Sequence, residues 1–157
     1  MSARDVSVRE VAIRTAGETD LPAVLRLYGQ PDVDDGQVLE LDAATAIFRR
    51  FATYPSYRLF VAEIDDCVVG SYALLVMDNL GHMGAPSTIA EDIMVDPLWQ
   101  GHGVGQAMME HAMEVAQAAG AYKLVLSSNT KRERAHAFYE RLGFVRHGYS
   151  FVADFSQ

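Results

Sequence analysis

Three glycines in the middle of the chain create a loop suited to holding an anion. Gly101, Gly103 and Gly105 follow a short apolar run that Asp96-Pro97 ends, and a helical pattern begins directly after them. Glycine reaches backbone conformations with positive φ and lets a ligand approach the main chain closely. The first N–H groups of a helix have no partner inside the helix and favour negative charge. This stretch therefore predicts a pyrophosphate-binding loop at the start of a helix.

Two common phosphate-binding motifs do not fit this loop. The Walker A motif G-x-x-x-x-G-K-[ST] does not occur in the chain. The dinucleotide motif G-x-G-x-x-G also fails, because glutamine or methionine stands where its third glycine must be. What remains is Q-x-x-G-x-G, formed by Gln100, Gly103 and Gly105.

A second string, A-x-x-F-Y-x-x-x-G-F, begins at Ala135 and contains Phe138 and Tyr139. A strand followed by Q/R-x-x-G-x-G/A and a helix resembles the acetyl-CoA loop of the GNAT superfamily of N-acetyltransferases. The second string is similar to the last helix and following strand of that superfamily. The close resemblance covers Thr88 to Phe155, whereas the first half agrees only in the order of its elements.

The resemblance implies an α/β fold with a mixed sheet in the order β-α-α-β-β-β-α-β-α-β-β, as a single domain over residues 1–157. It implies that central parallel strands splay apart and that the pantetheine arm of acetyl-CoA, the expected co-substrate, enters the gap. An N–H group near Met94 would polarise the thioester carbonyl, and loop N–H groups would hold the pyrophosphate. The residues expected to contact acetyl-CoA are Ile93, Met94, Val95, Gln100, Gly101, His102, Gly103, Val104, Gly105, Gln106, Asn129, Phe138 and Tyr139.

Some of these residues also have a purely structural interpretation. His102 is either a phosphate contact or a solvated loop histidine. Asn129 is either a contact to the pantetheine arm or a turn residue before the last helix. Phe138 is expected mainly to pack.

Two residues are candidates for proton transfer in acetyl transfer to an amine. Tyr139 is the candidate general acid, because a phenol with a pKa near ~10 is protonated at neutral pH. Its alternative role is that of an amphipathic residue on a buried helix face. Glu91 is the candidate base, since a carboxylate among apolar strand residues has a raised pKa; alternatively it is a salt-bridged strand end. Asp92 is the second choice, and regular alternation places it with Met94 on the face opposite Glu91.

The elements that must position these residues follow from hydrophobic periodicity. Strand patterns alternate with helical stripes, and Asp65-Asp66 predicts a hairpin turn. Gly70 indicates a bulge or a close backbone contact. Thr130 and Glu133 form a capping-box pattern. The expected strands are 8–13, 58–64, 68–77, 88–95, 122–126, 144–145 and 149–155. A first helix is expected to start near residue 20, and three more are expected at 43–53, 103–119 and 130–142.

Composition restricts the classes of function. The 157 residues carry a net charge of −8, which argues against nucleic-acid and anionic-membrane partners and favours a cationic substrate. No apolar run approaches the ~20 residues of a membrane span, and the N-terminus lacks an apolar signal region. The single Cys67 fits a reducing cytosol, so a cytoplasmic location is expected. No metal is expected, because the five histidines have no ligand spacing with Cys67.

The leading hypothesis is an acetyl-CoA-dependent N-acetyltransferase that acts on a small amine in a ternary complex. The alternatives are an enzyme that acetylates proteins or peptides, and a CoA-binding regulatory domain without turnover. Specificity is expected in the segments 30–37 and 78–87 and in the last hairpin, where loops carry recognition. The acidic segment 30–37 favours a cationic over a phosphorylated acceptor. A homodimer through the terminal strands is compatible with the sequence.

Overall fold

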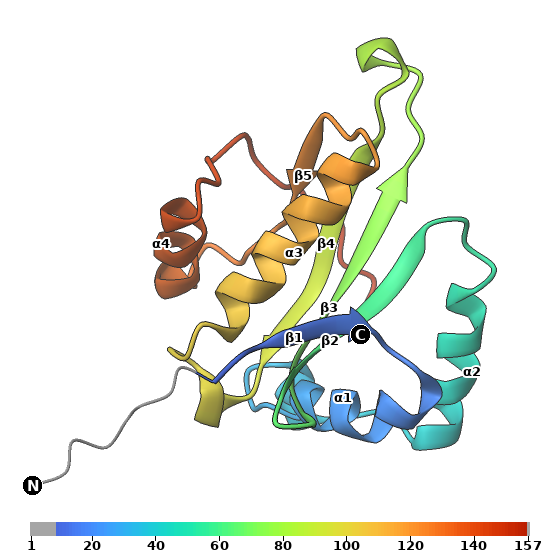
Figure 1. Ribbon diagram of the computed structural model, residues 1–157, viewed down its shortest axis with the longest axis vertical. Coiled ribbons are helices and arrows are strands. Elements are labelled where there is room, and N and C mark those ends of the chain that lie inside the picture. Colours follow the sequence, from blue (N-terminus) through green and yellow to red (C-terminus); the bar gives the residue numbers. More distant parts are fainter. Residues whose placement is uncertain (1–8, 157) are drawn as a thin grey trace, which may run out of the picture. The chain divides into compact units, whose positions relative to one another are not determined.

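The computed structural model describes residues 9–156, which divide into two compact units, one ending at Val125 and the other beginning at Leu126. The first unit contains a five-stranded sheet in the order β1-β2-β3-β4-β5 (Figure 1). Neighbouring strands are antiparallel from β1 to β4, and β5 is parallel to β4. The predicted α/β class with a mixed sheet is confirmed. The bounds are β1 Ala12–Thr15, α1 Leu21–Tyr28, α2 Leu41–Phe51, β2 Tyr57–Ile64, β3 Cys67–Met77, β4 Ser87–Val95, α3 Val104–Ala118, β5 Lys123–Val125 and, in the second unit, α4 Glu133–Arg141.

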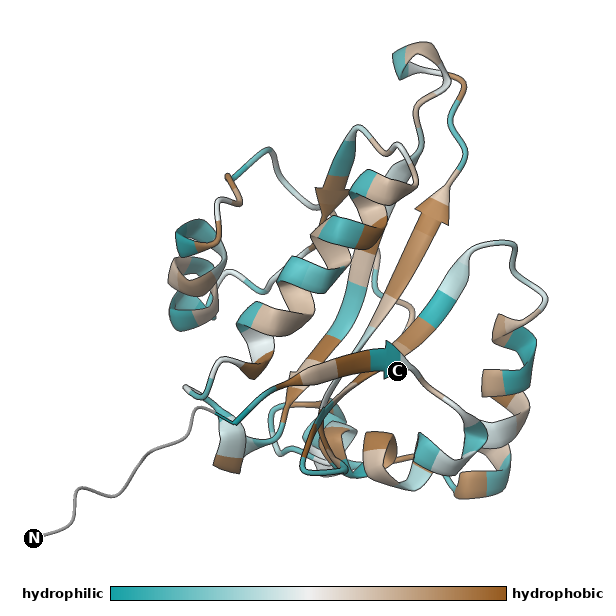
Figure 2. Cartoon of the chain, viewed as in Figure 1, coloured by the Kyte–Doolittle hydropathy of each residue, from teal (hydrophilic) through white to brown (hydrophobic). Residues whose placement is uncertain are grey.

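One face of the sheet packs against α1 and α2. Leu59, Val61 and Ala73 project from the strands into a buried cluster, where they meet Leu21 and Val24 of α1. These apolar side chains recur every second residue on β2 and every third on α1, which is how each element presents one side to the core. Figure 2 shows the strands of this sheet largely in the hydrophobic colour and the helices in alternating colours.

The opposite face of the sheet carries α3, and Gly70 allows the close approach. A Cβ atom at Gly70 would lie 2.9 Å from Val104 Cγ1 and 3.0 Å from Met108 Sδ. Val104 and Met108 are both buried, so neither has free space into which to move. A register shift also occurs here, between Ala62 and Glu63 of the neighbouring strand. The expected bulge and close contact at Gly70 are therefore both present.

The hairpin between β2 and β3 has the turn that the sequence predicts. Asp65 and Asp66 have φ of 49° and 61°, the left-handed conformations of a two-residue turn that suits twisted strands. Cys67 is the first residue after this turn and is exposed.

The parallel pairing of β4 with β5 is short. It joins Ser87, Thr88 and Ile89 to Lys123, Leu124 and Val125, and β5 ends there. Within residues 9–156, the rest of β4 from Ala90 to Val95 has no strand ladder on that side. The short pairing agrees with the predicted separation of the parallel strands. The part of β4 beyond Ile89 therefore has, within the described chain, an edge without a neighbouring strand.

Several predicted boundaries were wrong. The first strand begins at Ala12, and Val8 lies outside the described residues. α4 begins at Glu133 with Arg132 as its N-cap, so the capping box of Thr130 and Glu133 is not formed. The strands expected at 144–145 and 149–155 are absent from the described chain. A strand is defined by hydrogen bonds to a partner, and apolar alternation alone supplies none.

None of the helices in the described range is both long and apolar enough to cross a bilayer.

Candidate active site

The glycine loop owes its path to backbone conformation. Gly101 and Gly103 have φ of 77° and 84°, and a Cβ atom at either position would meet no atom within 4 Å. Packing therefore does not require glycine here. The left-handed conformation requires glycine, because a residue with a side chain loses about 1–2 kcal/mol of conformational free energy there. Gly103 is the N-cap of α3, so the loop leads directly into that helix.

The loop ends at free backbone donors. The first hydrogen bond of the α3 ladder runs from the Ala107 N–H to the Gly103 carbonyl, at 3.0 Å. The N–H groups of Val104, Gly105 and Gln106 therefore have no helical acceptor. The Gln106 side chain donates to Glu110 at 2.9 Å, while the Gln106 backbone N–H is one of the three donors without a helical acceptor. Three adjacent donors at the positive end of a helix form a site for a pyrophosphate.

Short contacts hold the beginning of the loop. Asp96 Oδ1 accepts from the Leu98 N–H at 2.9 Å, while the Asp96 N–H donates to the Val69 carbonyl at 2.8 Å. His102 Nδ1 lies 3.1 Å from the carbonyl of Gln100, which as an acceptor makes Nδ1 the donor. The His102 ring thus stabilises the loop internally, whereas the Gln100 side chain is exposed.

The open edge of β4 presents backbone polar groups. Because the Asp96 N–H points to β3, the Val95 carbonyl on the same peptide points away from β3. Gln30, just after α1, donates from Nε2 to this carbonyl at 3.1 Å and to the Leu27 carbonyl at 2.9 Å. Gln30 therefore fixes the end of β4 to the end of α1.

The same alternation changes the expectation for Met94. Met94 pairs with Ser71, next to the pair of Val95 with Gly70, so its backbone groups point toward β3. An N–H engaged with β3 is not free to polarise a thioester carbonyl. Ile93 and Val95 are the residues whose backbone groups alternate toward the open edge.

A bulge in β4 also changes which side chains share a face. Glu91 pairs with Ala73 and Met94 pairs with Ser71, so Asp92 and Ile93 together oppose the single residue Tyr72. Asp92 has a φ of 50°, which is uncommon for a residue other than glycine. Because Ala73 and Ser71 lie on one face of β3, Glu91 and Met94 lie together on the face that carries α1 and α2. The expectation that Glu91 and Met94 lie on opposite faces was wrong, because it assumed an unbroken alternation.

Acidic and phenolic groups surround this bulge. Burial and the neighbouring Asp92 carboxylate raise the pKa of Glu91. Burial and the Asp34 carboxylate raise the pKa of Asp92. Burial and Asp92 raise the pKa of both Tyr28, at the end of α1, and Tyr57, at the start of β2. Glu91 and Asp92 are exposed to solvent, so the surface at the bulge is acidic, and the charge of Asp92 reaches the phenols of Tyr28 and Tyr57.

The remaining predicted residues belong to the second unit. The side-chain oxygen of Asn129 accepts from the Lys131 N–H at 2.9 Å. The backbone carbonyl of Asn129 accepts from the Arg132 N–H at 3.0 Å. This is the turn geometry of the structural alternative for Asn129. The Tyr139 ring packs at 5.2 Å from Phe138 and 5.8 Å from Phe144, measured between centroids. Burial raises the pKa of Tyr139, and Arg132 opposes part of this rise.

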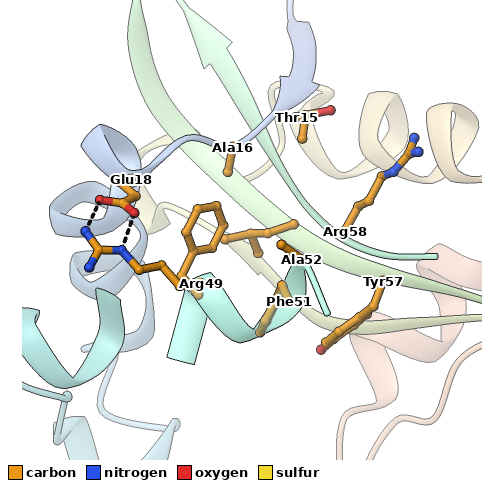
Figure 3. A pocket seen from close by; sticks show the side chains of 10 residues that line it. Thr15, Ala16, Glu18, Arg49, Phe51, Ala52, Tyr57 and Arg58 are labelled. Carbon is orange, nitrogen blue, oxygen red and sulfur yellow. Dashed lines mark hydrogen bonds and ion pairs between the residues drawn. The ribbon is translucent and has the colours of Figure 1, made fainter. Parts of the chain in front are cut away.

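An apolar groove of about 320 Å³ lies between α2 and the strands β1 and β2 (Figure 3). Figure 3 shows the paired Glu18 and Arg49 at one end and Tyr57 at the other. Phe48, Phe51 and Tyr57 supply its aromatic walls. None of the residues predicted to contact acetyl-CoA lines this groove, although the charges of Glu91 and Asp92 reach Tyr57.

Sequence reasoning assigned no site role to Tyr28, Tyr57 or Ser71, and it placed Gln30 only within the segment 30–37 that was expected to carry specificity. Each is separated from β4 in the sequence and reaches it only through the sheet and α1. Tyr28 continues the apolar stripe Leu21, Val24 and Leu25 at helical spacing, and Tyr57 stands just before the expected strand 58–64, so nothing local distinguishes either from a packing residue. No cluster of three or more potential metal ligands occurs in the described ranges.

Comparison with known proteins identifies the class of this site. Residues 21–144 match the acetyltransferase (GNAT) family. The glucosamine 6-phosphate N-acetyltransferase of Trypanosoma brucei brucei is 31% identical over 139 residues, which are 88% of this chain and 91% of that protein. The thialysine N-epsilon-acetyltransferase of Bos taurus is 31% identical over 145 residues, covering 85% of this chain and 83% of that protein. A solved structure from Agrobacterium tumefaciens strain C58 has a TM-score of 0.85 and 31% identity, covering 91% of this chain and 99% of that chain.

The chain therefore belongs to the GNAT family and is an acyltransferase. Members of this family use acetyl-CoA as their co-substrate. The named relatives are N-acetyltransferases of small amines.

Proposed function

We propose that this protein transfers the acetyl group of acetyl-CoA to a primary amine of a small molecule, by direct transfer in a ternary complex. One observation carries the proposal. The open, bulged edge of β4 runs straight into a loop whose helix N-terminus has three free N–H donors. An extended arm ending in a pyrophosphate has the shape and charge that such an edge and loop accept.

Binding of acetyl-CoA is assigned mainly to the backbone. Ile93 offers its edge N–H and carbonyl to the pantetheine arm and Val95 offers its N–H, because Gln30 already donates to the Val95 carbonyl. Val104, Gly105 and Gln106 donate N–H groups to the pyrophosphate. Gln100 adds a side-chain contact, while Gly101, His102 and Gly103 keep the loop in its shape. In the second unit, Asn129, Phe138 and Tyr139 are proposed to complete the cofactor contacts. Holding both reactants in place is worth up to about 7–11 kcal/mol of the barrier.

Glu91 is the proposed general base. The amine must lose a proton to become nucleophilic, and a carboxylate with a raised pKa accepts a proton more readily than an ordinary one. The proton passes from the ammonium group to a Glu91 oxygen, directly or through one water molecule. The amine nitrogen then attacks the thioester carbon, whose carbonyl accepts a hydrogen bond from the Ile93 N–H.

Tyr139 is the proposed general acid. When the carbon–sulfur bond breaks, the sulfur leaves as a thiolate that needs a proton. A phenol with a raised pKa is fully protonated at neutral pH and donates that proton from its oxygen. The nitrogen of the tetrahedral intermediate loses its remaining extra proton to water, which returns a proton to the Tyr139 oxygen, and Glu91 releases its proton to solvent. The products are the acetylated amine, the CoA thiol and one proton.

A thiol-release assay with acetyl-CoA tests the proposal on a panel of alkylamines, diamines, amino sugars, amino sugar phosphates and lysine peptides. We expect release of CoA with at least one small amine, and calorimetric binding of acetyl-CoA to the folded protein. Turnover of peptides alone would replace the small-molecule assignment with protein acetylation. Binding of acetyl-CoA without turnover of any acceptor would leave a CoA-binding domain, and no binding would refute the proposal.

A further inference from the structure

Arg9, in the short segment before β1, contacts an aromatic residue at the start of the glycine loop. Its guanidinium carbon lies over the Trp99 ring, 5.7 Å from the ring centroid. The same guanidinium pairs through Nη1 with Asp65 Oδ2 at 3.2 Å, in the turn between β2 and β3. Arg9 thus connects three segments that are far apart in the sequence. Figure 1 shows the blue start of the described chain next to the yellow loop.

Trp99 is the residue around which the bend 96–102 is built. Its N–H donates to the Asp96 carbonyl at 2.8 Å, and its carbonyl accepts from the His102 N–H at 3.3 Å. The His102 ring meets the Trp99 ring edge-on, with 5.5 Å between the centroids. Trp99 therefore contacts both ends of the bend. A displacement of its ring would move the backbone that leads to the free N–H donors of α3.

The charge of the surrounding chain makes a guanidinium at this place unusual. Residues 59–122, which include β3, β4, the glycine loop and α3, contain several acidic residues but no lysine or arginine. A cation beside the loop must therefore come from another part of the chain, as Arg9 does. A guanidinium is planar and stacks on an aromatic face, which a lysine ammonium cannot do in the same way.

The ion pair with Asp65 matters for geometry more than for energy. The two side chains are 59% and 71% exposed, so their attraction is screened by solvent and contributes little to stability. It does restrict where the guanidinium of Arg9 lies. The turn at Asp65 belongs to the sheet, whereas Trp99 belongs to the loop. Arg9 therefore links the conformation of the loop to a fixed point on the sheet.

We propose that Arg9 is a positioning residue of the pyrophosphate loop: held by Asp65, it keeps the Trp99 ring, and with it the bend 96–102, in the conformation that binds acetyl-CoA. This inference rests on the proposed function and adds a residue from the N-terminal segment to the site. A loop that is ordered before binding loses less conformational freedom when the ligand arrives. Because Arg9 acts on the loop and not on the reacting atoms, its removal should weaken binding of the diphosphate and leave the chemical step unchanged.

The first test needs no cofactor. Hydrogen exchange of the backbone amides 97–106 should become faster in Arg9→Gln, and the fluorescence emission of Trp99, the sole tryptophan of the sequence, should change. Asp65→Asn should act in the same direction. Asp66→Asn is the matched control, because Asp66 occupies the same turn, also has a positive φ and forms no ion pair among residues 9–156. Asparagine suits both positions of such a turn.

The second test compares acetyl-CoA with S-acetylpantetheine, which carries the same thioester without the pyrophosphate, in the thiol-release assay. Arg9→Gln should raise the KM for acetyl-CoA about two- to fivefold, the scale of a guanidinium–aromatic contact at an exposed site. The kcat and the KM for S-acetylpantetheine should stay unchanged. Arg9→Lys keeps the charge without the planar face and should recover only part of the affinity. Asp65→Asn should also raise the KM for acetyl-CoA, and Asp66→Asn should not.

Three outcomes would overturn the inference and leave the proposed function intact. One is an equal rise in KM for both thioesters, and another is an equal effect of Asp65→Asn and Asp66→Asn. The third is a lower KM for acetyl-CoA in Asp65→Asn, which would mean that a released Arg9 attracts the cofactor directly by its charge. If the natural chain neither binds nor uses acetyl-CoA, the proposed function fails. Hydrogen exchange then decides the role of Arg9, and unchanged exchange of the loop in Arg9→Gln would refute it.

Discussion

The proposed role of Tyr139 predicts an effect on the rate of acetyl transfer without an effect on acetyl-CoA binding. Tyr139→Phe removes one oxygen and keeps the ring that packs against Phe138 and Phe144. We expect kcat to fall about 10²–10⁴-fold, since a general acid contributes on that scale, while the dissociation constant for acetyl-CoA changes little. Steady-state kinetics and calorimetry measure the two quantities. Tyr149→Phe, at an exposed tyrosine, is the control, and a loss of affinity without a loss of kcat in Tyr139→Phe would contradict the acid role.

Glu91 and Asp92 lead to a prediction about pH. Asp92 helps to raise the pKa of Glu91, so Asp92→Asn lowers the pKa of Glu91 in the free enzyme. A base must be deprotonated to act, and activity is therefore lost as the pH falls through its pKa. The acidic limb of kcat/KM, measured with a monoamine, should move to lower pH in Asp92→Asn. An unmoved limb would show that Glu91 is not the titrating base.

At the scale of elements, the two ends of α3 provide a matched pair of glycines. Gly103 and Gly120 have φ of 84° and 73°, and a Cβ atom at either would meet no atom within 4 Å. Gly103→Val and Gly120→Val should each lower the free energy of unfolding by about 1–2 kcal/mol, because both force a side chain into the left-handed region. Only Gly103→Val should abolish acetyl-CoA binding, as measured by calorimetry. Equal affinities in the two variants would remove the loop from the site.

The elements nearest the glycine loop were predictable because their signals are local. Asp96-Pro97, the alternating glycines and the stripe of α3 lie within one short stretch, and the structure agrees with them to within one residue. The strands expected at 144–145 and 149–155 failed because pairing depends on a partner elsewhere in the chain. The bulge at Asp92 was missed for a related reason, since a single inserted residue leaves no mark on composition. Tyr28, Gln30 and Ser71 join the candidate site only through tertiary packing.

At the scale of the whole molecule, a buried polar pair connects the sheet to its covering helix. Tyr72, fully buried on β3, has its hydroxyl 2.6 Å from His111 Nδ1 on α3, and Phe60 packs against both rings. Burial lowers the pKa of His111 below its ordinary value of 6.5, and Glu114 opposes part of this effect. The neutral imidazole is thus the form that the fold prefers, with Nδ1 accepting from the phenol.

This pair predicts how stability depends on pH. A histidine whose pKa is lower in the folded state stabilises the fold above pH 6.5, and this contribution is lost as the pH falls toward the lower folded value. Urea unfolding measures the free energy of unfolding at pH 8 and at pH 5.5. We expect this free energy to fall less between the two pH values in His111→Gln than in the natural chain. His147→Gln, at an exposed histidine, should behave like the natural chain. Tyr72→Phe should lower the unfolding free energy by about 1 kcal/mol at pH 8. An identical pH response in His111→Gln would exclude His111 as its source.

The exposed thiol after the β2–β3 turn matters for anyone who measures this enzyme. Cys67 is the sole cysteine in the sequence, so a chromogenic disulfide reagent will consume one equivalent per chain before any product appears. Cys67→Ser removes that background without touching the proposed site. The natural chain, in turn, accepts a single fluorophore at a defined position, from which ligand-induced changes on the sheet can be followed by emission.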